Sequence, residues 1–488
     1  MTMLTGEDYR RSIRDGRATY IDGARVDDVT RHPLLKVSVD WVAKTYDQRH
    51  AKDPGARNPM YSAPGSVEDL ARQMAFLAGA DFTAATTAGC MSLREILPEL
   101  RALHEAYGGR LESFLDRCAE GDLRIAAATE DGGVSPRGRV RVVERRADGV
   151  VLRGAKRHVL GASVVHELLV APSGAMTAEQ ADEAIACAVP PAAEGLKIVN
   201  ITSAPRAEDD RHYPVSREFS VPDCYLVFDD VFVPSERVFL CGETAFAGNI
   251  VDTLGIWERA RSAAEMADRA ELVLGLAQII AEMNGVEKVE HIRNKLSMIA
   301  VWASMCRAGW ERALAKAHVT PAGTVRPDES AVYATKAYGG ERYNDMLSYL
   351  HDICGGLVLT VPATADYDNQ ATHHYMEKYL RTMDGVTGED RMKIFHLVRD
   401  MSADQYGGWK KVTEQMIGGG LIAQRMNALD HYPLEDVKAR ARAAAHIRPR
   451  AAGAADTAPS SHIRPRAAGA ADAAPSSQPS HREPPVGG

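Results

Sequence analysis

Two ionisable side chains in the C-terminal half of the chain could transfer protons. Glu414 lies just before the run Gly418-Gly419-Gly420. A carboxyl group that enters a glycine-rich loop can be partly buried, which would raise its pKa toward neutrality, so Glu414 is the best candidate general base. His291 is the second candidate, as an acid or a base, although a lone histidine on an amphipathic helix is more often an exposed or capping side chain.

The cysteines indicate neither a disulfide framework nor a zinc site. There are seven, an odd number without a closely spaced pair: Cys90, Cys118, Cys187, Cys224, Cys241, Cys306 and Cys354. Most are expected to be small buried apolar side chains. Cys90 is a weak candidate nucleophile, because nothing near it in the sequence would lower its pKa.

The elements that must position these groups begin with a helical region over residues 1–137. Ser66 precedes an expected helix as its cap, and an apolar face repeats at helical spacing in Leu93, Ile96, Leu97 and Leu100. Residues 138–244 then contain short β-prone runs separated by turns, which predicts a small antiparallel sheet or barrel. Within it, Tyr225 to Phe228 is expected to be a strand that Asp229 and Asp230 break and Pro234 stops.

Residues 245–445 return to long helical segments, which fit a bundle of four or more helices. A glycine-rich turn is expected at residues 408–420, followed by one last polar helix. Residues 446–488 differ in composition, because the run from His446 to Asp456 recurs from His462 to Asp472 in an Ala/Pro/Ser-rich background. We expect a disordered tail without a function of its own.

Charge and hydropathy exclude several classes of function. The formal net charge is −8 and no basic stripe is interleaved with aromatic residues, so nucleic acid is not an expected partner. No apolar run is long enough to cross a membrane, and residues 1–16 lack an apolar signal core. The expectation is a cytoplasmic protein.

Several spaced motifs resemble one family, the 4-hydroxyphenylacetate 3-hydroxylase and 4-hydroxybutyryl-CoA dehydratase flavoproteins. The resemblance covers residues 4–443. It rests on the opening segment from Leu4 to Pro33, Gly154-Ala155-Lys156-Arg157-His158, the segment from Val227 to Glu243, Asp352-Ile353-Cys354-Gly355-Gly356, Glu377-Lys378-Tyr379-Leu380 and Glu389-Asp390-Arg391-Met392.

The resemblance implies an acyl-CoA dehydrogenase-like α+β fold, with FAD between the β domain and the helical bundle, in a homotetramer or another homo-oligomer. No GxGxxG fingerprint follows a first strand, so side chains and helix ends would hold the flavin. Cations favour a pyrophosphate and an anionic reduced flavin, and a Gly-Gly turn lets backbone approach a cofactor. The expected flavin-binding residues are Arg137, Arg139, Lys156, His158, Asp352, Gly355 and Gly356, although solvated charges and helix capping would also explain them.

The dehydratase branch of this family uses an iron–sulfur cluster held by three cysteines and one histidine. The run from Glu414 to Gly420 resembles that branch, His291 matches its cluster histidine and Cys90 one of its cysteines. Thr86 and Met298 stand at the other two ligand positions, and neither can replace a thiolate. We therefore expect no iron–sulfur cluster and no metal site. Lys295, in place of a tyrosine, further weakens dehydration.

In the monooxygenase branch, reduced FAD from a partner reductase reacts with oxygen and a phenol is hydroxylated. That branch holds the phenol with an Arg, a Tyr and a His. Arg110 matches the first, whereas Phe114 and Ala127 occupy the other two positions and cannot relay a proton.

The leading hypothesis is thus a reduced-flavin monooxygenase that acts on a small or carrier-bound substrate other than a simple phenol, with a separate flavin reductase. Two alternatives stay open. One is a cluster-free dehydratase, isomerase or dehydrogenase of an acyl thioester, in which Glu414 and His291 move protons. The other is an inactive flavin-binding scaffold.

Overall fold

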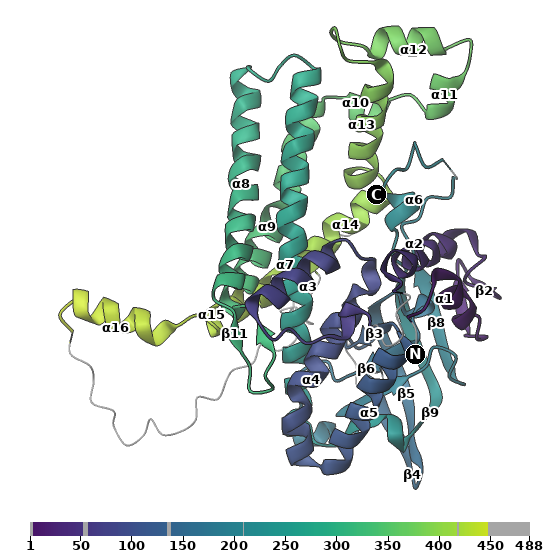
Figure 1. Cartoon of the computed structure of the whole chain (residues 1–488), viewed down its shortest axis with the longest axis vertical. Helices are drawn as coiled ribbons and strands as arrows, with labels where there is room; N and C mark the ends of the chain where they lie inside the picture. The colour runs from purple at the N-terminus through teal and green to yellow at the C-terminus, as the bar shows by residue number, and fades with distance from the viewer. Residues whose placement is uncertain (1–2, 52–56, 134–137, 208, 417–418, 448–488) are drawn as a thin grey trace, which may run out of the picture.

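The computed structural model describes residues 3–51, 57–133, 138–207, 209–416 and 419–447. Figure 1 shows three long helices beside one another at one side and a β region packed against shorter N-terminal helices at the other. Arg137 and nearly all of the duplicated tail lie outside the described residues.

The N-terminal segment is mainly helical, as its periodicity predicts, and its described residues form five α-helices. They are α1 (Gly6–Ser12), α2 (Pro33–Arg49), α3 (Val67–Ala78), α4 (Ala85–Leu103) and α5 (Glu105–Gly121). Ser66 caps α3 as expected, because its hydroxyl accepts a hydrogen bond from the Asp69 N–H at 3.0 Å. A short 3-10 helix, η2 (Phe82–Ala84), precedes α4.

The segment is not purely helical, which corrects the expectation for residues 1–137. It also contributes β1 (Thr19–Ile21), β2 (Ala24–Val26) and β3 (Ile125–Ala128). β1 pairs in parallel with β8 and β3 in parallel with β6, so these strands belong to sheets built mainly by later residues.

The β region consists of two mixed sheets with a shared apolar core. The remaining strands are β4 (Arg141–Arg146), β5 (Gly149–Leu160), β6 (Glu167–Val170), β7 (Ile185–Val189), β8 (Leu196–Ile201), β9 (Asp223–Pro234) and β10 (Val238–Cys241). The strand orders are β2-β1-β8-β9-β5-β4 and β10-β7-β6-β3. Leu168, Ile185, Ile198 and Leu226 are among the buried residues that fill the space between the sheets.

β9 does not stop at the two aspartates, contrary to the expectation. It continues to Pro234, where it pairs with Gly149. Asp230 takes the positive φ of 58° at an irregularity in the pairing with β5, and its carboxylate points outward to Arg153. The strand therefore absorbs the aspartates on its exposed side.

The C-terminal part is an array of helices. Its long members are α7 (Thr244–Met283), α8 (Glu290–Ala315) and α9 (Glu329–Cys354). The others are α10 (Leu357–Thr360), α11 (Thr364–Asp368), α12 (His373–Leu380), α13 (Gly388–Ser402), α14 (Gln405–Met416), α15 (Gly420–Asp430) and α16 (Leu434–Ala444), with α6 (Ser216–Phe219) in the β region and the small β11 (His318–Val319) and β12 (Val325–Arg326) pair between α8 and α9.

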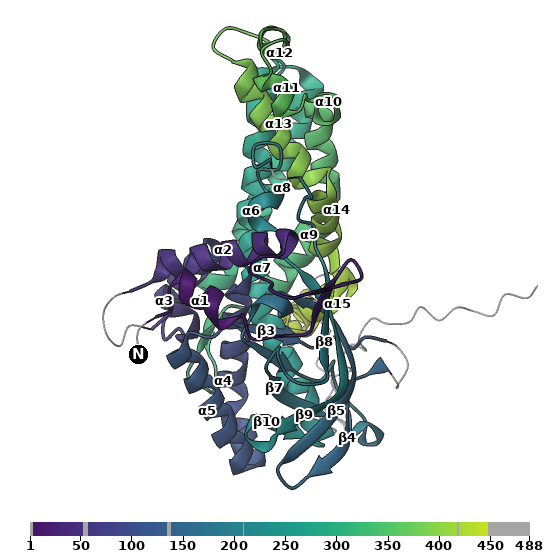
Figure 2. The ribbon, with the colours of Figure 1, turned by 90° about the vertical axis from the view of Figure 1, so that its right-hand side faces the viewer.

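The expected glycine-rich turn is largely helical, because α14 includes Gly407 and Gly408 and runs to Met416. Gly407 is needed there, since a Cβ atom would lie 2.4 Å from the carbonyl carbon of Ser402. The last predicted helix is split into α15 and α16. α14 runs beside the upper end of the sheets (Figure 2).

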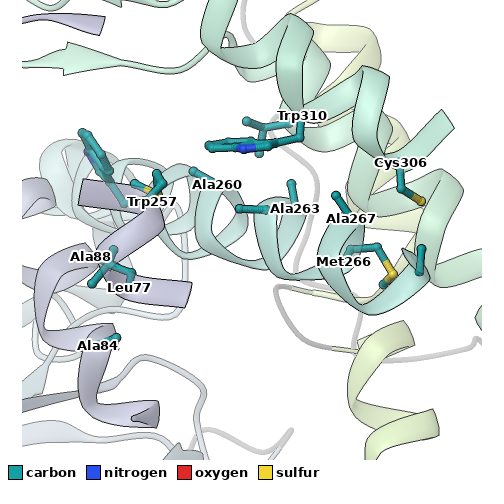
Figure 3. Packing of buried hydrophobic residues seen from close by; sticks show 14 of the residues in the cluster. Leu77, Ala84, Ala88, Trp257, Ala260, Ala263, Met266, Ala267, Cys306 and Trp310 are labelled. Carbon is teal, nitrogen blue, oxygen red and sulfur yellow. The ribbon is translucent and has the colours of Figure 1, made fainter. Parts of the chain in front are cut away.

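α7 forms the centre of the main apolar core. Its alanine-rich face carries Trp257, Ala260 and Ala263, which belong to one buried cluster with Ala84 and Ala88 from η2 and α4 and with Trp310 of α8 (Figure 3). Small side chains on this face let neighbouring helices approach closely. The polar side chains of α7 therefore lie on its other face.

Candidate active site at the junction of α7, α9 and α14

Glu414 lies at the centre of a group of charged side chains, which we call the α7–α9–α14 charge cluster. The cluster comprises Arg261, Glu265, Arg269, Lys336, Lys410 and Glu414. Glu414 is 4% exposed, and its carboxylate accepts hydrogen bonds from Lys336 Nζ at 2.8 Å and from Arg269, with Lys410 Nζ at 2.9 Å. Three cations from three helices thus surround one buried carboxylate.

This environment overturns the expected raised pKa of Glu414. Burial by itself would raise the pKa, but Arg269, Lys336 and Lys410 outweigh it and hold the pKa well below its ordinary value. Glu414 is therefore a stable anion at neutral pH and a poor proton acceptor. The prediction correctly placed the side chain in a buried polar site, but its charge state favours the role of a fixed counter-ion.

A charged face of α7 continues the cluster. Glu258, Arg261, Glu265 and Arg269 follow one another at helical spacing, and Arg261 pairs with Glu265 at 2.7 Å. The side chains of Arg261, Glu265 and Arg269 are 15%, 26% and 19% exposed. The cluster is thus open to solvent along this face and closed at Glu414.

The cluster lies where the helical array meets the β region. On α14, Trp409 packs against the buried apolar cluster that includes Phe82 and Val164, and Gln405 Nε2 donates to the carbonyl of Thr202 at 3.0 Å. Lys410 follows Trp409 directly and faces Glu414. α14 therefore joins the end of the sheet to the charged face of α7.

Lys156 was expected to bind a flavin phosphate, but three protein oxygens already bind its ammonium group. Nζ lies 2.8 Å from Asp131 Oδ1 and donates to the carbonyl oxygens of Thr129 at 2.9 Å and Ala171 at 3.0 Å. An ammonium group has three N–H donors, and the side chain is 2% exposed. Lys156 therefore ties the loop after β3 to β5 and β6, and it leaves no donor for a phosphate.

Arg139 and His158 are more open. Arg139 Nη1 pairs with Glu183 at 3.0 Å while its side chain stays 32% exposed. His158 is 64% exposed on β5, in a left-handed conformation with φ of 55°, and its Nδ1 lies 3.7 Å from Asp223. Both could reach an anionic group at the edge of the sheet.

Asp352, Gly355 and Gly356 lie at the end of α9, as predicted. Asp352 forms an ion pair with Lys295, and Gly355 ends the helix with a φ of 64°. A Cβ atom at Gly355 or Gly356 would have no described atom within 4 Å. This open backbone fits the expected close approach of a cofactor.

The described chain does not bring His291 together with Cys90. Lys295, one turn after His291, pairs with Asp352 at the end of α9, whereas Glu95, close to Cys90 on α4, pairs with Arg326 just before the start of α9. The 26 residues of α9 span about 39 Å. Within one chain these two side chains therefore cannot ligate the same cluster. His291 is exposed. Its helix contacts α9 at Asp352, whereas Glu414 contacts α9 at Lys336, about 24 Å earlier along the helix, so His291 is also distant from Glu414.

The other two positions of the cluster motif have non-thiolate surroundings. Thr86 is buried, and its hydroxyl accepts from the Ile125 N–H at 2.8 Å. Met298 is 45% exposed. Cys90 is buried, and that burial raises the pKa of its thiol to about 12, which also removes it as a nucleophile near neutral pH. That no iron–sulfur cluster is bound remains a prediction from these residues.

Arg110 lies on α5 beside the β region, where its Nη1 donates to the carbonyl of Val238 at 3.3 Å. Phe114, one turn later, is buried against Phe239 with ring centroids 5.2 Å apart. Ala127 is half-buried on β3. Arg110 therefore lies close to apolar side chains. The two positions at which a proton relay was expected, Phe114 and Ala127, carry no titratable group.

Sequence reasoning missed the cationic partners of Glu414. Two short spacings carried a signal, because Arg261 and Glu265 are four residues apart, as are Lys410 and Glu414, and both pairs form ion pairs on one helix face. Arg269 and Lys336 are separated from Glu414 by 145 and 78 residues. Only the tertiary structure brings them to it.

Comparisons with known proteins place this arrangement in a fold class. The structure matches the oxygenase component of 4-hydroxyphenylacetate 3-monooxygenase with a TM-score of 0.83 at 23% identity, covering 91% of this chain and 98% of that one. It matches an archaeal 4-hydroxybutyryl-CoA dehydratase from N. maritimus with a TM-score of 0.82 at 24% identity, covering 92% and 96%. The fold is therefore the expected acyl-CoA dehydrogenase-like one.

The sequence gives the family. Residues 5–240 match the model described as 4-hydroxyphenylacetate 3-hydroxylase N terminal, and residues 247–446 match the corresponding C-terminal model. The chain belongs to the 4-hydroxyphenylacetate 3-hydroxylase family and is an enzyme of this type.

Relatives in this family carry different activities. A 4-hydroxybutyryl-CoA dehydratase/vinylacetyl-CoA-Delta-isomerase from Clostridium aminobutyricum is 26% identical over 91% of this chain and 100% of that protein. A Streptomyces globisporus monooxygenase of a peptidyl-carrier-protein-bound 3-amino-3-(3-chloro-4-hydroxyphenyl)propanoyl group is 26% identical over 87% of both. Within the described residues, none of the helices has the length and apolar character needed to cross a bilayer.

Proposed function

We propose that this chain is the oxygenase component of a two-component monooxygenase, which uses reduced FAD supplied by a separate reductase. The match of both family models along the chain carries this proposal. Relatives from Thermus thermophilus and Rhodococcus opacus, both 26% identical, are named as oxygenase components. Reduced FAD would supply the activation of oxygen.

Arg139 and His158 at the sheet and the open Gly355–Gly356 turn would hold the flavin. Each of these keeps accessible surface or open backbone, whereas Lys156 does not fit as a direct ligand. The oxygenase component of 4-hydroxyphenylacetate 3-monooxygenase has been solved in complex with FAD. In this proposal Glu414 is a positioning residue, because it fixes Arg269 and Lys410 beside the open face of α7.

The substrate is proposed to be small or carrier-bound and different from a simple phenol. Phe114 and Ala127 support this choice, because neither side chain can accept or pass on a proton at the two positions expected to do so. The relative from Streptomyces globisporus acts on a carrier-bound substrate. The second candidate is a dehydratase or isomerase of an acyl thioester, supported by the full-length match to the clostridial dehydratase.

The purified chain, mixed with FAD, NADH and a flavin reductase, should add one oxygen atom to an accepted substrate. Oxygen consumption should exceed that of the reductase with FAD alone, and mass spectrometry should detect the oxygenated product. A screen of carrier-bound and free hydroxyaromatic compounds provides the substrates. Failure to bind either oxidised or reduced FAD in spectroscopic titrations would rule out this function.

We also propose a homo-oligomer. On the outer face of α7 and α8, Leu272, Ile279, Met298, Val301 and Met305 are 44–56% exposed, which is a large apolar area for an isolated subunit. Light scattering should give a molar mass of at least two chains. A triple variant in which Met298, Val301 and Met305 are each replaced by glutamate should have a lower molar mass. A single-chain mass for the unmodified protein would contradict the proposal.

A further inference from the structure

One buried cation of the helical array has no carboxylate beside it. This cation is Arg391 of α13, which is 5% exposed and forms no ion pair with any described residue. The other buried cationic side chains of the described chain each pair with a carboxylate at 2.7–3.3 Å: Arg17 with Asp15, Arg124 with Asp122, Lys156 with Asp131 and Lys336 with Glu414. Because a buried charge is costly unless it is paired, the exception at Arg391 indicates a missing anion.

The hydrogen bonds of Arg391 use only one nitrogen of its guanidinium group. Nη1 donates to Asn284 Oδ1 at 2.8 Å, to the Met283 carbonyl at 3.3 Å and to Thr382 Oγ1 at 3.5 Å. Nε is a buried donor without a partner in the described chain, and no described residue accepts a hydrogen bond from Nη2. The edge of the guanidinium group formed by Nε and Nη2 is therefore free.

The same edge binds oxyanions elsewhere in this chain. Arg17 donates from Nε to Asp15 Oδ1 at 2.8 Å and from Nη2 to Asp15 Oδ2 at 2.7 Å. Arg153 binds both oxygens of Asp230 in the same way, at 2.9 Å and 2.7 Å. This planar pair of donors matches two oxygens of a carboxylate or a phosphate. Arg391 therefore has the free donors that such an oxyanion requires.

The two carboxylates that precede Arg391 on α13 do not supply this oxyanion. Glu389 pairs with Lys393 at 2.8 Å, one turn further along the exposed side of the helix. Asp390 accepts a hydrogen bond from the hydroxyl of Thr387, the cap of α13, at 2.8 Å. Residues one and two positions apart on a helix do not face each other. The partner of Arg391 must therefore come from outside this helix.

The guanidinium group lies where the ends of two long helices meet the start of α13. Asn284, which accepts from Arg391, caps the end of α7, and its Nδ2 donates to the carbonyl of Ile353 in the last turn of α9 at 3.3 Å. Gly355 and Gly356 follow, with space for a ligand beside their backbone. Residues 381–385, which include the third acceptor, are exposed. This end of the array, with α12 and α13, lies at the top of Figure 1.

We propose that the free edge of Arg391 binds a phosphate-type oxyanion, supplied either by the pyrophosphate group of FAD or by free phosphate. The open backbone at Gly355 and Gly356 favours a phosphate ligand at this end of α9, because it leaves room for a bulky group close to the main chain. The flavin source rests on the proposed function, which places FAD at this turn, whereas the binding of free phosphate does not. Either source neutralises the buried cation and joins the ends of α7 and α9 to α13.

Thermal unfolding with inorganic pyrophosphate tests the site without any reaction. Pyrophosphate should raise the Tm of the unmodified chain above its value in sodium chloride of equal ionic strength, because a ligand that binds only the folded state stabilises it. Arg391→Met should abolish this increase. Arg391→Lys, which keeps the positive charge and loses the planar edge, should retain only a small part of it.

Arg381→Met is the matched control, because Arg381 belongs to the exposed segment beside the site and its side chain is 51% exposed. This variant should keep the full increase in Tm. The inference is overturned if pyrophosphate leaves the Tm of the unmodified chain unchanged. It is equally overturned if Arg391→Met and Arg391→Lys both keep the full increase, or if Arg381→Met loses it while they do not.

Titration with flavins distinguishes the two sources of the oxyanion. If FAD supplies it, Arg391→Met should weaken FAD binding about tenfold or more, since hydrogen bonds to a charged group are lost, and should leave the affinity for riboflavin unchanged. Unchanged FAD affinity, together with loss of the pyrophosphate effect, would assign the site to free phosphate. A chain that binds no flavin would refute the proposed function, and the pyrophosphate measurement would still decide the role of Arg391.

A carboxylate from a second copy of the chain is the competing partner. In that case Arg391→Met should lower the molar mass measured by light scattering, and pyrophosphate should not raise the Tm of the unmodified chain. This pair of results would overturn the inference, because the free edge would then serve contact between subunits.

Discussion

Glu414→Gln is expected to lower the free energy of unfolding by about 3–5 kcal/mol, the usual cost of breaking a buried ion pair from one side. Glutamine keeps the volume but removes the charge, so Arg269, Lys336 and Lys410 would repel one another around a neutral amide. Lys336 is the most strongly affected, since its side chain is only 3% exposed. Urea or guanidinium unfolding followed by circular dichroism measures this loss.

The pH dependence follows from the sign of the pKa shift. Because folding lowers the pKa of Glu414, its stabilising contribution is fully present above the unfolded pKa of about 4.3 and disappears as the pH falls through the folded value. The difference in stability between the unmodified chain and Glu414→Gln should therefore stay constant at neutral pH and shrink only in strong acid. A difference that disappears between pH 6 and 8, which is about where a general base would titrate, would restore the original interpretation of Glu414.

The matched control is Glu435→Gln on α16. Glu435 also pairs with a lysine, Lys438, but both side chains are exposed and no buried residue lies on that helix. Exposed pairs of this kind contribute little to stability. An equal effect of the two substitutions would mean that the cations around Glu414 are solvated in the folded protein.

Local signals in the sequence predicted much of the helical structure. The Ser66 cap and the apolar face of α4 depend on residues a few positions apart, and both are observed. Strand pairing depends on distant residues, and there the prediction was incomplete. β1 joins its sheet through β8, about 180 residues later, as the contact between Asn200 and the Tyr20 carbonyl shows.

The two aspartates in β9 show why residue type alone misplaced the end of a strand. Asp229 and Asp230 usually favour turns, but here both point to the solvent side, where Asp229 pairs with Lys197 and Asp230 with Arg153. Their neighbours on either side continue to pair with β5. The cations that pair with these carboxylates come from other strands, so the local sequence does not reveal them.

The candidate site shows the same limit. The sequence singled out Glu414 and predicted a raised pKa from burial alone, because two of the three cations around this side chain come from distant residues. With three cations added, the direction of the shift reverses. The direction of a pKa shift at such a junction can be predicted only when the tertiary structure is known.

Lys156→Met should destabilise the fold by about 3–5 kcal/mol, because it leaves the carboxylate of Asp131 without its buried cation. The substitution also removes the donors that the carbonyl groups of Thr129 and Ala171 use. The loop after β3 would then lose the contact that holds it to β5. A phosphate ligand would behave differently, since its removal would weaken FAD binding and leave the apoprotein as stable as before.

Two measurements on the same variant distinguish these roles. Unfolding of the apoprotein reports the structural contribution, and titration with FAD reports the cofactor contribution. Lys197→Met is the control, because Lys197 lies on β8 of the same sheet and forms an exposed pair with Asp229; it should change stability little. If Lys156→Met unfolds at the same denaturant concentration as the unmodified apoprotein but binds FAD more weakly, then the ammonium group serves the cofactor, and the contacts to Asp131, Thr129 and Ala171 are not what stabilise the loop.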